Sequence, residues 1–212
     1  MTEIIFILDR SGSMEGLEKD TIGGFNSMMK KQASVPGDAL VSTLLFDNDV
    51  EVIHDRLNIK DVPEMTSKEY YVRGGTALLD AVGGAIKHIS MIHKYARKED
   101  VPEKTLFIIT TDGMENASRR YSYEDVRSMV EHQKSKYGWE FIFLGANIDA
   151  QAEASKYGID ESMSVNYNCD SKGMEISFKV MDDVVSSYRS TCEVPKEWRK
   201  RIDDDFKSRR KI

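Results

Sequence analysis

Short apolar runs alternate along this chain with longer stretches in which apolar residues recur every three or four positions. The short runs are rich in β-branched and aromatic residues, which is typical of buried strands. We therefore predict strands at Ile4–Leu8, Leu40–Phe46, Lys104–Thr111, Trp139–Leu144 and Met163–Val165. The longer stretches have the period of amphipathic helices, and we predict helices at Gly16–Ala33, Leu78–Tyr95, Ser122–Tyr137, Ala150–Tyr157 and Ser171–Ser190. Such alternation indicates an α/β fold with a mostly parallel sheet.

One further apolar run departs from this alternation. Only the polar turn 47–49 separates Leu40–Phe46 from the run Val50–Ile53. Two strands this close form a hairpin, so we expect the second one to lie antiparallel at the edge of the sheet. Residues 54–72 show no clear period and are predicted to be mostly loop. The expected architecture is a three-layer, doubly wound sheet with helices on both faces.

Two predicted helices carry informative local signals. Gly83 and Gly84 lie inside the helix Leu78–Tyr95, where each costs about 1 kcal/mol relative to alanine. Close packing of that helix on the sheet would explain why they are tolerated. Ser122, followed three residues later by Asp125, resembles a helix N-cap.

A polar cluster with three short oxygen-bearing side chains follows the first predicted strand. Asp9, Ser11 and Ser13 supply one carboxylate and two hydroxyls within five residues. In open α/β sheets, ligands bind at the carboxyl ends of the strands, which is where this cluster falls. The alternative is a turn and helix cap, in which the same side chains bind free backbone N–H groups.

Two later segments add oxygen donors of the same kind. Thr76 follows two glycines just before a predicted helix, and Asp112 follows the strand Lys104–Thr111. For Thr76 the alternative is an N-cap of that helix, a role compatible with facing a cation. Oxygen-only donors suit a hard cation, so we expect Mg²⁺, with Mn²⁺ or Ca²⁺ as alternatives.

The three segments together resemble the metal-ion-dependent adhesion site (MIDAS) of von Willebrand factor type A (VWA) domains. The order of elements is similar over about residues 2–190. The resemblance implies a Rossmann-like fold and five protein ligands of the metal, direct or through water: Asp9, Ser11, Ser13, Thr76 and Asp112. It also implies binding of a protein partner whose Asp or Glu carboxylate completes the metal shell.

Other residues near these segments are candidates for supporting roles. We expect a ligand-binding rim around the metal that is formed by Arg10, Met14, Arg73, Met114 and Glu115. Methionine beside arginine makes an adaptable binding surface, although each of these could equally be a plain loop residue. Asp80 lies one helical turn after Thr76 and could orient a ligand or a bound water from the second shell, or simply be a solvated helix residue.

Composition and charge limit the remaining possibilities. The length of 212 residues suits one VWA-like domain at 1–193 and a basic helical tail at 194–212. Trp198, Ile202 and Phe206 form one apolar stripe on that tail, either packed on the domain or docking on an acidic surface. The net charge of −6 argues against nucleic-acid binding, and no apolar run is long enough to span a membrane. We expect no signal peptide and, with only two cysteines, a cytoplasmic location.

Three functions compete on these grounds. The leading hypothesis is a non-enzymatic, metal-dependent module that binds a protein. The alternative is a metal-dependent phosphoryl-transfer hydrolase with Asp9 as nucleophile, but Ser11 stands where such hydrolases carry a second aspartate, and no phosphate loop of the GxxxxGK[ST] type is present. A scaffold without a metal is the third, and it is disfavoured because all five ligand positions are filled.

Overall fold

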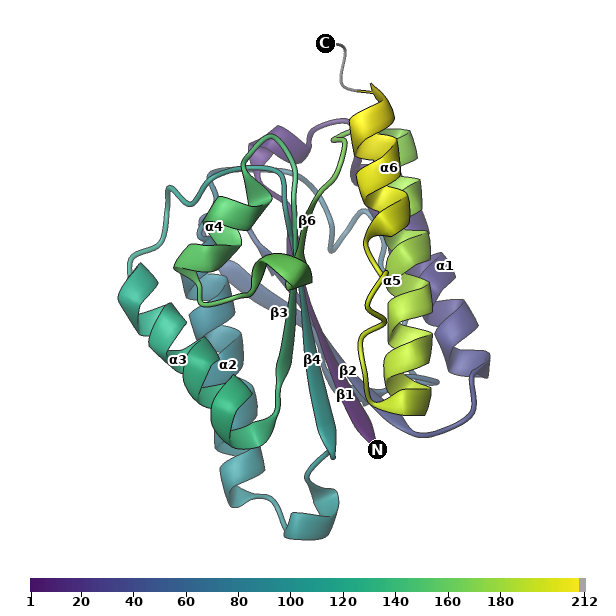
Figure 1. Ribbon diagram of the computed structural model, residues 1–212, viewed down its shortest axis with the longest axis vertical. Helices are drawn as coiled ribbons and strands as arrows, with labels where there is room; N and C mark the ends of the chain where they lie inside the picture. The colour runs from purple at the N-terminus through teal and green to yellow at the C-terminus, as the bar shows by residue number, and fades with distance from the viewer. Residues whose placement is uncertain (210–212) are drawn as a thin grey trace.

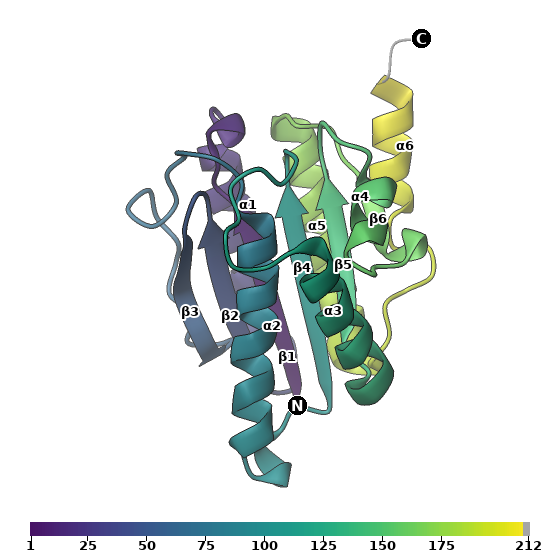
Figure 2. The ribbon, with the colours of Figure 1, turned by 90° about the vertical axis from the view of Figure 1, so that its left-hand side faces the viewer.

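The sheet has the predicted doubly wound topology. In the computed structural model, which describes residues 1–209, six strands lie in the order β3-β2-β1-β4-β5-β6. They are β1 (Thr2–Asp9), β2 (Ala39–Phe46), β3 (Val50–Asn58), β4 (Lys104–Thr111), β5 (Glu140–Gly145) and β6 (Ser164–Asn166). All neighbouring strands are parallel except β2 and β3, which are antiparallel at one edge (Figure 2). The expected fold class and the antiparallel edge strand are both confirmed.

Helices cover both faces of the sheet (Figure 1). One face carries α1 (Glu18–Ser34), α5 (Ser171–Thr191) and α6 (Lys200–Arg209). The other carries α2 (Leu78–Tyr95), α3 (Tyr123–Tyr137) and α4 (Ala150–Lys156). Short 3-10 turns are η1 (Gly12–Met14), η2 (Lys98–Asp100) and η3 (Glu161–Met163). None of the helices described is both long enough and apolar enough to span a lipid bilayer.

The central strand β1 is buried along its whole length. Ile4, Phe6 and Leu8 pack into the core under α1 and α5, whereas Ile5 and Ile7 pack into the core under α2. Side chains alternate between the faces of a strand, and here both faces are covered by helices. This explains why the segment reads as a continuous apolar run.

The edge strand β3 is longer than predicted. It continues to Asn58, so residues 54–58 are strand, whereas 59–77 form an irregular loop. The extension was not predicted because His54, Asp55 and Arg56 are polar and show no strand-like apolar pattern. His54 is nevertheless buried and bonded to Thr43, and Arg56 has a positive φ beside a shift in the strand register. An edge strand pairs on one side only, so its pattern is less apolar than that of a central strand.

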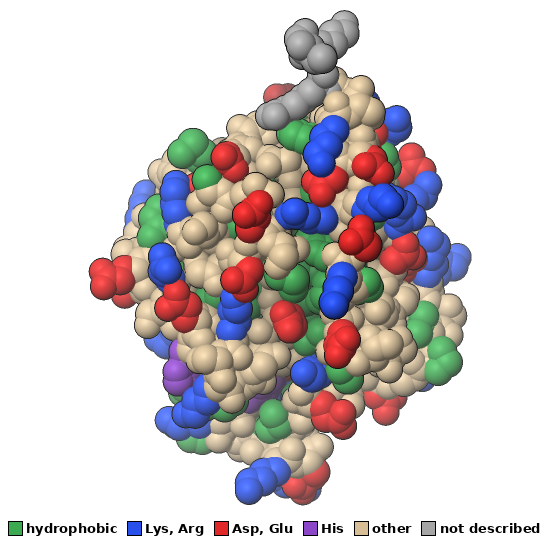
Figure 3. All heavy atoms as spheres, in the orientation of Figure 1, with side chains coloured by type: hydrophobic (Ala, Val, Ile, Leu, Met, Phe, Trp, Pro, Cys, Tyr) green, Lys and Arg blue, Asp and Glu red, His purple; other side chains and the backbone are tan. Residues whose placement is uncertain are grey.

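The segment after residue 193 packs on the domain. Trp198 and Ile202 belong to the same core as β1, and the indole N–H of Trp198 donates to the Ser162 carbonyl. Arg201 pairs with Asp183 on α5, and Figure 3 shows cations and carboxylates interspersed over α5 and α6. Trp198 and Ile202 of the apolar stripe therefore serve the chain's own core, whereas Phe206 is only partly buried. Arg210 and Lys211 of the expected basic tail lie outside the described residues.

The two glycines inside α2 have different surroundings. A Cβ on Gly83 would lie 2.7 Å from Cγ of Tyr121, whereas a Cβ on Gly84 would meet nothing within 4 Å. The expected close packing thus exists only at Gly83, and against the loop before α3 instead of the sheet. The predicted N-cap of α3 is confirmed, because Ser122 and Asp125 form a capping box.

The glycine pair provides a matched test of this packing. Gly83→Ala should destabilise the protein by about 1–3 kcal/mol, because three ring atoms of Tyr121 would lie within 2.9 Å of the new Cβ and the ring or the helix must shift. Gly84→Ala should stabilise it by up to about 1 kcal/mol, because alanine is the better helix former. Urea unfolding of both variants measures the free energies. Equal effects of the same sign would contradict this account of the packing.

Candidate metal centre

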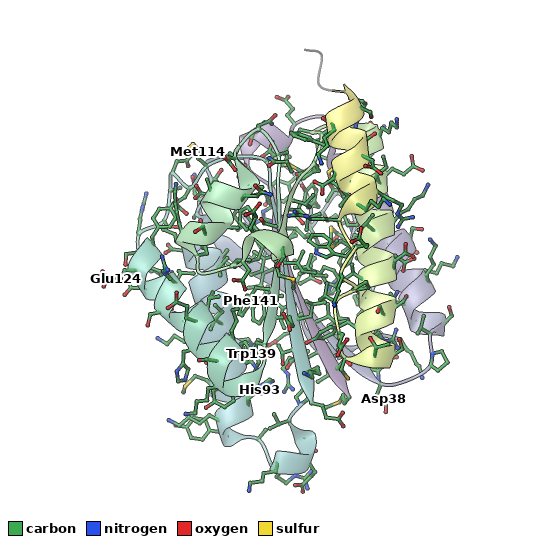
Figure 4. The ribbon with its side chains drawn as sticks, in the orientation of Figure 1. Asp38, His93, Met114, Glu124, Trp139 and Phe141 are labelled. Carbon is green, nitrogen blue, oxygen red and sulfur yellow. The ribbon has the colours of Figure 1, made fainter. Side chains whose placement is uncertain are left out.

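The predicted ligands meet at the carboxyl edge of the sheet. Asp9 ends β1, Asp112 follows β4, and these two strands are neighbours in the sheet. The chain leaves β1 toward β2 on one side and reaches β4 on the other, so the site lies where the strand order reverses. Such switch points are where open α/β sheets bind ligands. In Figure 4, Met114 marks this end, and His93 and Trp139 lie toward the opposite end.

The carboxylate of Asp9 is held by neutral donors. It is 1% exposed. The Ser11 backbone N–H donates to its Oδ1 at 2.7 Å, and the Thr111 hydroxyl donates to its Oδ2 at 2.7 Å. The Tyr70 hydroxyl donates to the Asp9 carbonyl at 2.5 Å. The donors fix the position of this carboxylate without neutralising its charge.

A chain of hydroxyls connects the Asp9 loop with Asp112. Ser11 Oγ lies 3.0 Å from Ser13 Oγ, and Ser13 donates to Asp112 Oδ1 at 2.6 Å. The Cys169 thiol approaches the other oxygen of Asp112 at 3.7 Å. Ser13 and Asp112 are 99 residues apart in sequence, so this contact exists only because β1 and β4 end together.

Thr76 is brought to the same place by hydrogen bonds that hold the backbone of its loop. Gly12 N–H donates to the Gly74 carbonyl at 3.2 Å, and Thr76 N–H donates to Oδ1 of Asn116 at 2.8 Å. A Cβ on Gly113 would lie 3.6 Å from Thr76 Oγ1 and 3.7 Å from Ser13 Oγ. The two hydroxyls therefore lie on one side of Gly113.

The hydroxyl of Thr76 does not cap α2. The N-cap position is Ala77, and no side chain at that position caps the helix, so the N-cap interpretation of Thr76 is wrong. Thr76 is 3% exposed, and its hydroxyl has no hydrogen-bond partner in the part of the chain that the structure describes. This oxygen is available to another ligand.

Burial makes the two carboxylates costly to ionise. It raises the pKa of Asp9 to about 6, and the charge of Asp112 acts in the same direction, whereas hydrogen bonds from Ser11 and Thr111 oppose the shift. Burial also raises the pKa of Asp112, and that of the Cys169 thiol to about 11. Within residues 1–209, no ion pair includes Asp9 or Asp112.

The donor set fits a hard divalent cation. It consists of two carboxylates and three hydroxyls, all short side chains on backbone that is itself hydrogen-bonded. The described residues include no group of three or more His, Cys, Asp and Glu placed to hold a metal, so any ion here would depend on the hydroxyls. Oxygen donors of low total charge suit Mg²⁺ better than a soft metal.

Two of the predicted rim residues are buried. Arg10 is 0% exposed: its Nε donates to Asp47 at 2.8 Å and its Nη1 to the Glu69 carbonyl at 2.9 Å. Met14 is 1% exposed and packs in the core with β1. The expectation that these side chains lie on an exposed rim is wrong, because both turn inward from the loop after β1.

Two acidic residues support the loop after β4. Glu115 accepts hydrogen bonds from the N–H groups of Leu79 and Ser118. The Asp80 carboxylate accepts three, all from the backbone of 119–121. Their oxygens thus hold segment 113–121 against the first turn of α2. Asp80 acts on this loop and not on a metal ligand, contrary to the expected second-shell role.

Met114 and Arg73 are the predicted rim residues that remain exposed. Met114 is 58% exposed, and the Arg73 side chain is 47% exposed. The sequence analysis missed Tyr70, Thr111 and Asn116, which hold Asp9 and Thr76 in place. Only Thr111 had a sequence signal, as the neighbour of Asp112, because the other two come from loops with no periodic pattern.

Solved structures show what this fold is similar to. No protein-family model and no curated protein sequence matches the chain. A variant of the PilB minor pilin from Streptococcus sanguinis aligns with a TM-score of 0.60 and 13% identity, over 92% of this chain and 63% of the pilin. A von Willebrand factor type A structure from Catenulispora acidiphila aligns with a TM-score of 0.59 and 17% identity, over 88% and 42%.

A third structure contains a metal. Proximal thread matrix protein 1 from the mussel byssus, with a zinc-occupied MIDAS motif, aligns with a TM-score of 0.56 and 17% identity, over 87% of this chain and 45% of that one. This chain spans less than two thirds of each of the three structures. The TM-scores show a shared fold, and at identities of 13–17% the likeness is one of fold alone.

The raised pKa of Asp9 predicts a pH-dependent cost. The folded state binds this proton more tightly than the unfolded chain, so stability falls as the pH rises from about 4 to about 6, by about 3 kcal/mol in total. Asp9→Asn carries no charge and should escape this cost. Its amide can donate to the Thr111 hydroxyl, whose own proton can then turn to the Gly113 carbonyl, 3.1 Å away.

Thermal unfolding in EDTA should therefore show Asp9→Asn to be more stable than wild type at pH 8, with the difference vanishing near pH 4. Groups that titrate in both proteins cancel in this comparison. Added Mg²⁺ should stabilise wild type and leave the variant unchanged, because a ligand that binds only the folded state raises its stability. Equal stability at pH 8 would contradict the cost assigned to Asp9.

Proposed function

Because the chain has the von Willebrand factor type A fold, with five oxygen-bearing side chains gathered at its switch point, we propose that it is an Mg²⁺-dependent protein-binding module. The bound ion accepts an acidic side chain of the partner. The observation that carries this proposal is the pair of buried carboxylates, Asp9 and Asp112, with raised pKa values and no cation beside them among residues 1–209.

The charge balance of the site supports an anionic partner group. Two carboxylates neutralise the charge of a divalent ion, and the hydroxyls of Ser11, Ser13 and Thr76 add none. An ion held this way remains electrophilic enough to accept a further carboxylate. Gly12 and Ser13 are exposed, so the side of the site away from the sheet is open to a partner. Mn²⁺ and Ca²⁺ are the alternative ions.

A hydrolase with Asp9 as nucleophile is less well supported. Asp9 is buried, and Ser11 stands where such hydrolases carry a second aspartate. That position therefore offers no carboxyl group to act as general acid or base for the leaving group. We therefore propose a binding role without catalysis. The cytoplasmic location expected from the sequence also stays a proposal, which the two unpaired cysteines Cys169 and Cys192 support.

Metal binding can be measured directly with Mn²⁺, whose free ion gives an electron paramagnetic resonance signal. Wild type should remove this signal, and added Mg²⁺ should restore it. Asp112→Asn should weaken Mn²⁺ binding at least about tenfold, because loss even of an outer partner costs a metal site about 10–100-fold. Glu124→Gln is the control, since Glu124 is an exposed carboxylate on α3 (Figure 4). Unchanged Mn²⁺ binding by Asp112→Asn would contradict the ligand assignment.

The acidic partner group can be tested with a synthetic peptide. A surface coated densely with a Gly/Ser peptide that contains one Asp should bind the protein in Mg²⁺ and release it in EDTA. The same peptide with Asn in place of Asp should not bind, because a neutral amide is a far weaker metal ligand than a carboxylate. Binding that persists in EDTA would show recognition without the ion. Hydrolysis of a phosphate ester by wild type, lost in Asp9→Ala, would favour the hydrolase instead.

A further inference from the structure

The loop that delivers Thr76 also presents an exposed guanidinium. The Arg73 side chain is 47% exposed, and its Nε donates to Oδ2 of Asp47 at 2.8 Å. Its Cζ lies 5.2 Å from the centre of the Tyr71 ring, within the range of a cation–π contact. The guanidinium is therefore held on one edge and on one face.

The support beneath Arg73 is rigid. Asp47 is 1% exposed and accepts a second hydrogen bond at 2.8 Å from Nε of the buried Arg10. The Arg10 guanidinium lies 5.3 Å from the same Tyr71 ring. The backbone carbonyl of Asp47 accepts the Ala77 N–H at 2.7 Å. Arg73 and the residue after Thr76 are thus anchored to one buried residue, Asp47, the first through its side chain and the second through its backbone carbonyl.

Arg73 also lies beside the metal loop. Its N–H donates to the Arg10 carbonyl at 3.0 Å, and the next residue, Gly74, accepts the N–H of Gly12 at 3.2 Å. Two consecutive backbone contacts therefore join 73–74 to the loop that carries Asp9, Ser11 and Ser13. The backbone of Arg73 is therefore a direct neighbour of the proposed metal loop.

The outer edge of this guanidinium is free. Within residues 1–209, Nη1 and Nη2 of Arg73 have no partner. A guanidinium presents a planar pair of N–H donors that matches the two oxygens of a carboxylate. Asp47, Asp49 and Glu51 lie nearby, so net charge here does not attract anions from a distance. Arg73 must therefore recognise a carboxylate through the geometry of its two N–H donors, whereas the metal ion provides the main attraction for the acidic partner.

We propose that Arg73 is a second carboxylate subsite of this surface. The partner then presents two acidic groups on one segment: one completes the metal shell and the other accepts two hydrogen bonds from Nη1 and Nη2 of Arg73. This inference rests on the proposed function, because it assigns a second contact to the same partner. It makes the site selective for a diacidic segment over a single acidic residue.

The test compares peptides with one and with two acidic residues. Gly/Ser peptides would carry either one Asp or two Asp separated by zero to three residues, and binding would be measured in Mg²⁺ and in EDTA. For wild type, the best-spaced diacidic peptide should bind at least about tenfold more tightly than the single-Asp peptide, as expected for charge-assisted hydrogen bonds. Arg73→Gln should abolish this preference and retain Mg²⁺-dependent binding of the single-Asp peptide.

Two further variants make the comparison specific. Arg97→Gln removes the same charge from an exposed residue just before the turn η2, at the amino end of the sheet (Figure 1), and should keep the full preference. Arg73→Lys keeps the positive charge but lacks the planar pair of N–H donors, so it should keep only part of the preference for the diacidic peptide. The retained single-Asp binding by Arg73→Gln shows that Thr76 is still in place.

The outcomes separate the two proposals. Equal binding of all peptides by wild type, or a preference that survives in Arg73→Gln, would overturn the Arg73 subsite and leave the metal-dependent module intact. A preference of the same size in Arg73→Lys would show that charge, and not the planar pair of N–H donors, is recognised. No Mg²⁺-dependent binding of any peptide would contradict the proposed function and this inference with it.

Discussion

The site depends on one constraint, which is that two parallel strands at the centre of the sheet end side by side, each with a buried carboxylate. Asp9 and Asp112 are each 1% exposed. Among the described residues they receive hydrogen bonds and no ion pair. Burial of carboxylates without a cation raises the free energy of ionisation, and hydroxyl donors offset only part of it. A divalent ion would remove that cost, so the chemistry of the site follows from where β1 and β4 end.

The cation adjacent in sequence does not provide this compensation. Arg10 follows Asp9 directly, yet its side chain turns away and pairs with Asp47 and Glu51. Successive residues of an extended chain point in opposite directions, so the two charges leave the strand end on different sides. Arg10 supports the 73–77 loop: its side chain bonds Asp47, and its carbonyl accepts the N–H of Arg73. The buried pair Arg10 and Asp47 therefore positions both the loop that carries Thr76 and the guanidinium of Arg73. The two proposed contacts with a partner depend on this one pair.

Acidic residues around the site divide into two groups. Glu115 and Asp80 accept backbone N–H groups and hold the loop after β4 on the start of α2, where negative charge is favoured by the helix dipole. Asp9 and Asp112 instead accept hydrogen bonds from hydroxyl groups at the end of the sheet. Glu115 and Asp80 stabilise the loop after β4, whereas the buried charges of Asp9 and Asp112 favour the binding of a cation. All four are carboxylates in or next to the segments that form the site, and only the folded surroundings distinguish them.

The sequence by itself determined the layer architecture, the antiparallel edge and the five oxygen-bearing residues of the candidate site, because hydrophobic period and strand ends are local properties. It failed where the outcome depends on what lies opposite a residue. The segment 54–58 forms strand because β2 offers backbone partners, and Trp198 and Ile202 of the C-terminal apolar stripe fill the chain's own core. Arg10 and Met14 are buried although they flank the ligand residues. Which side chain faces the ion, which braces a loop and which remains free at the rim was decided only by the tertiary structure, because contacts between loops distant in sequence fix the direction of each side chain.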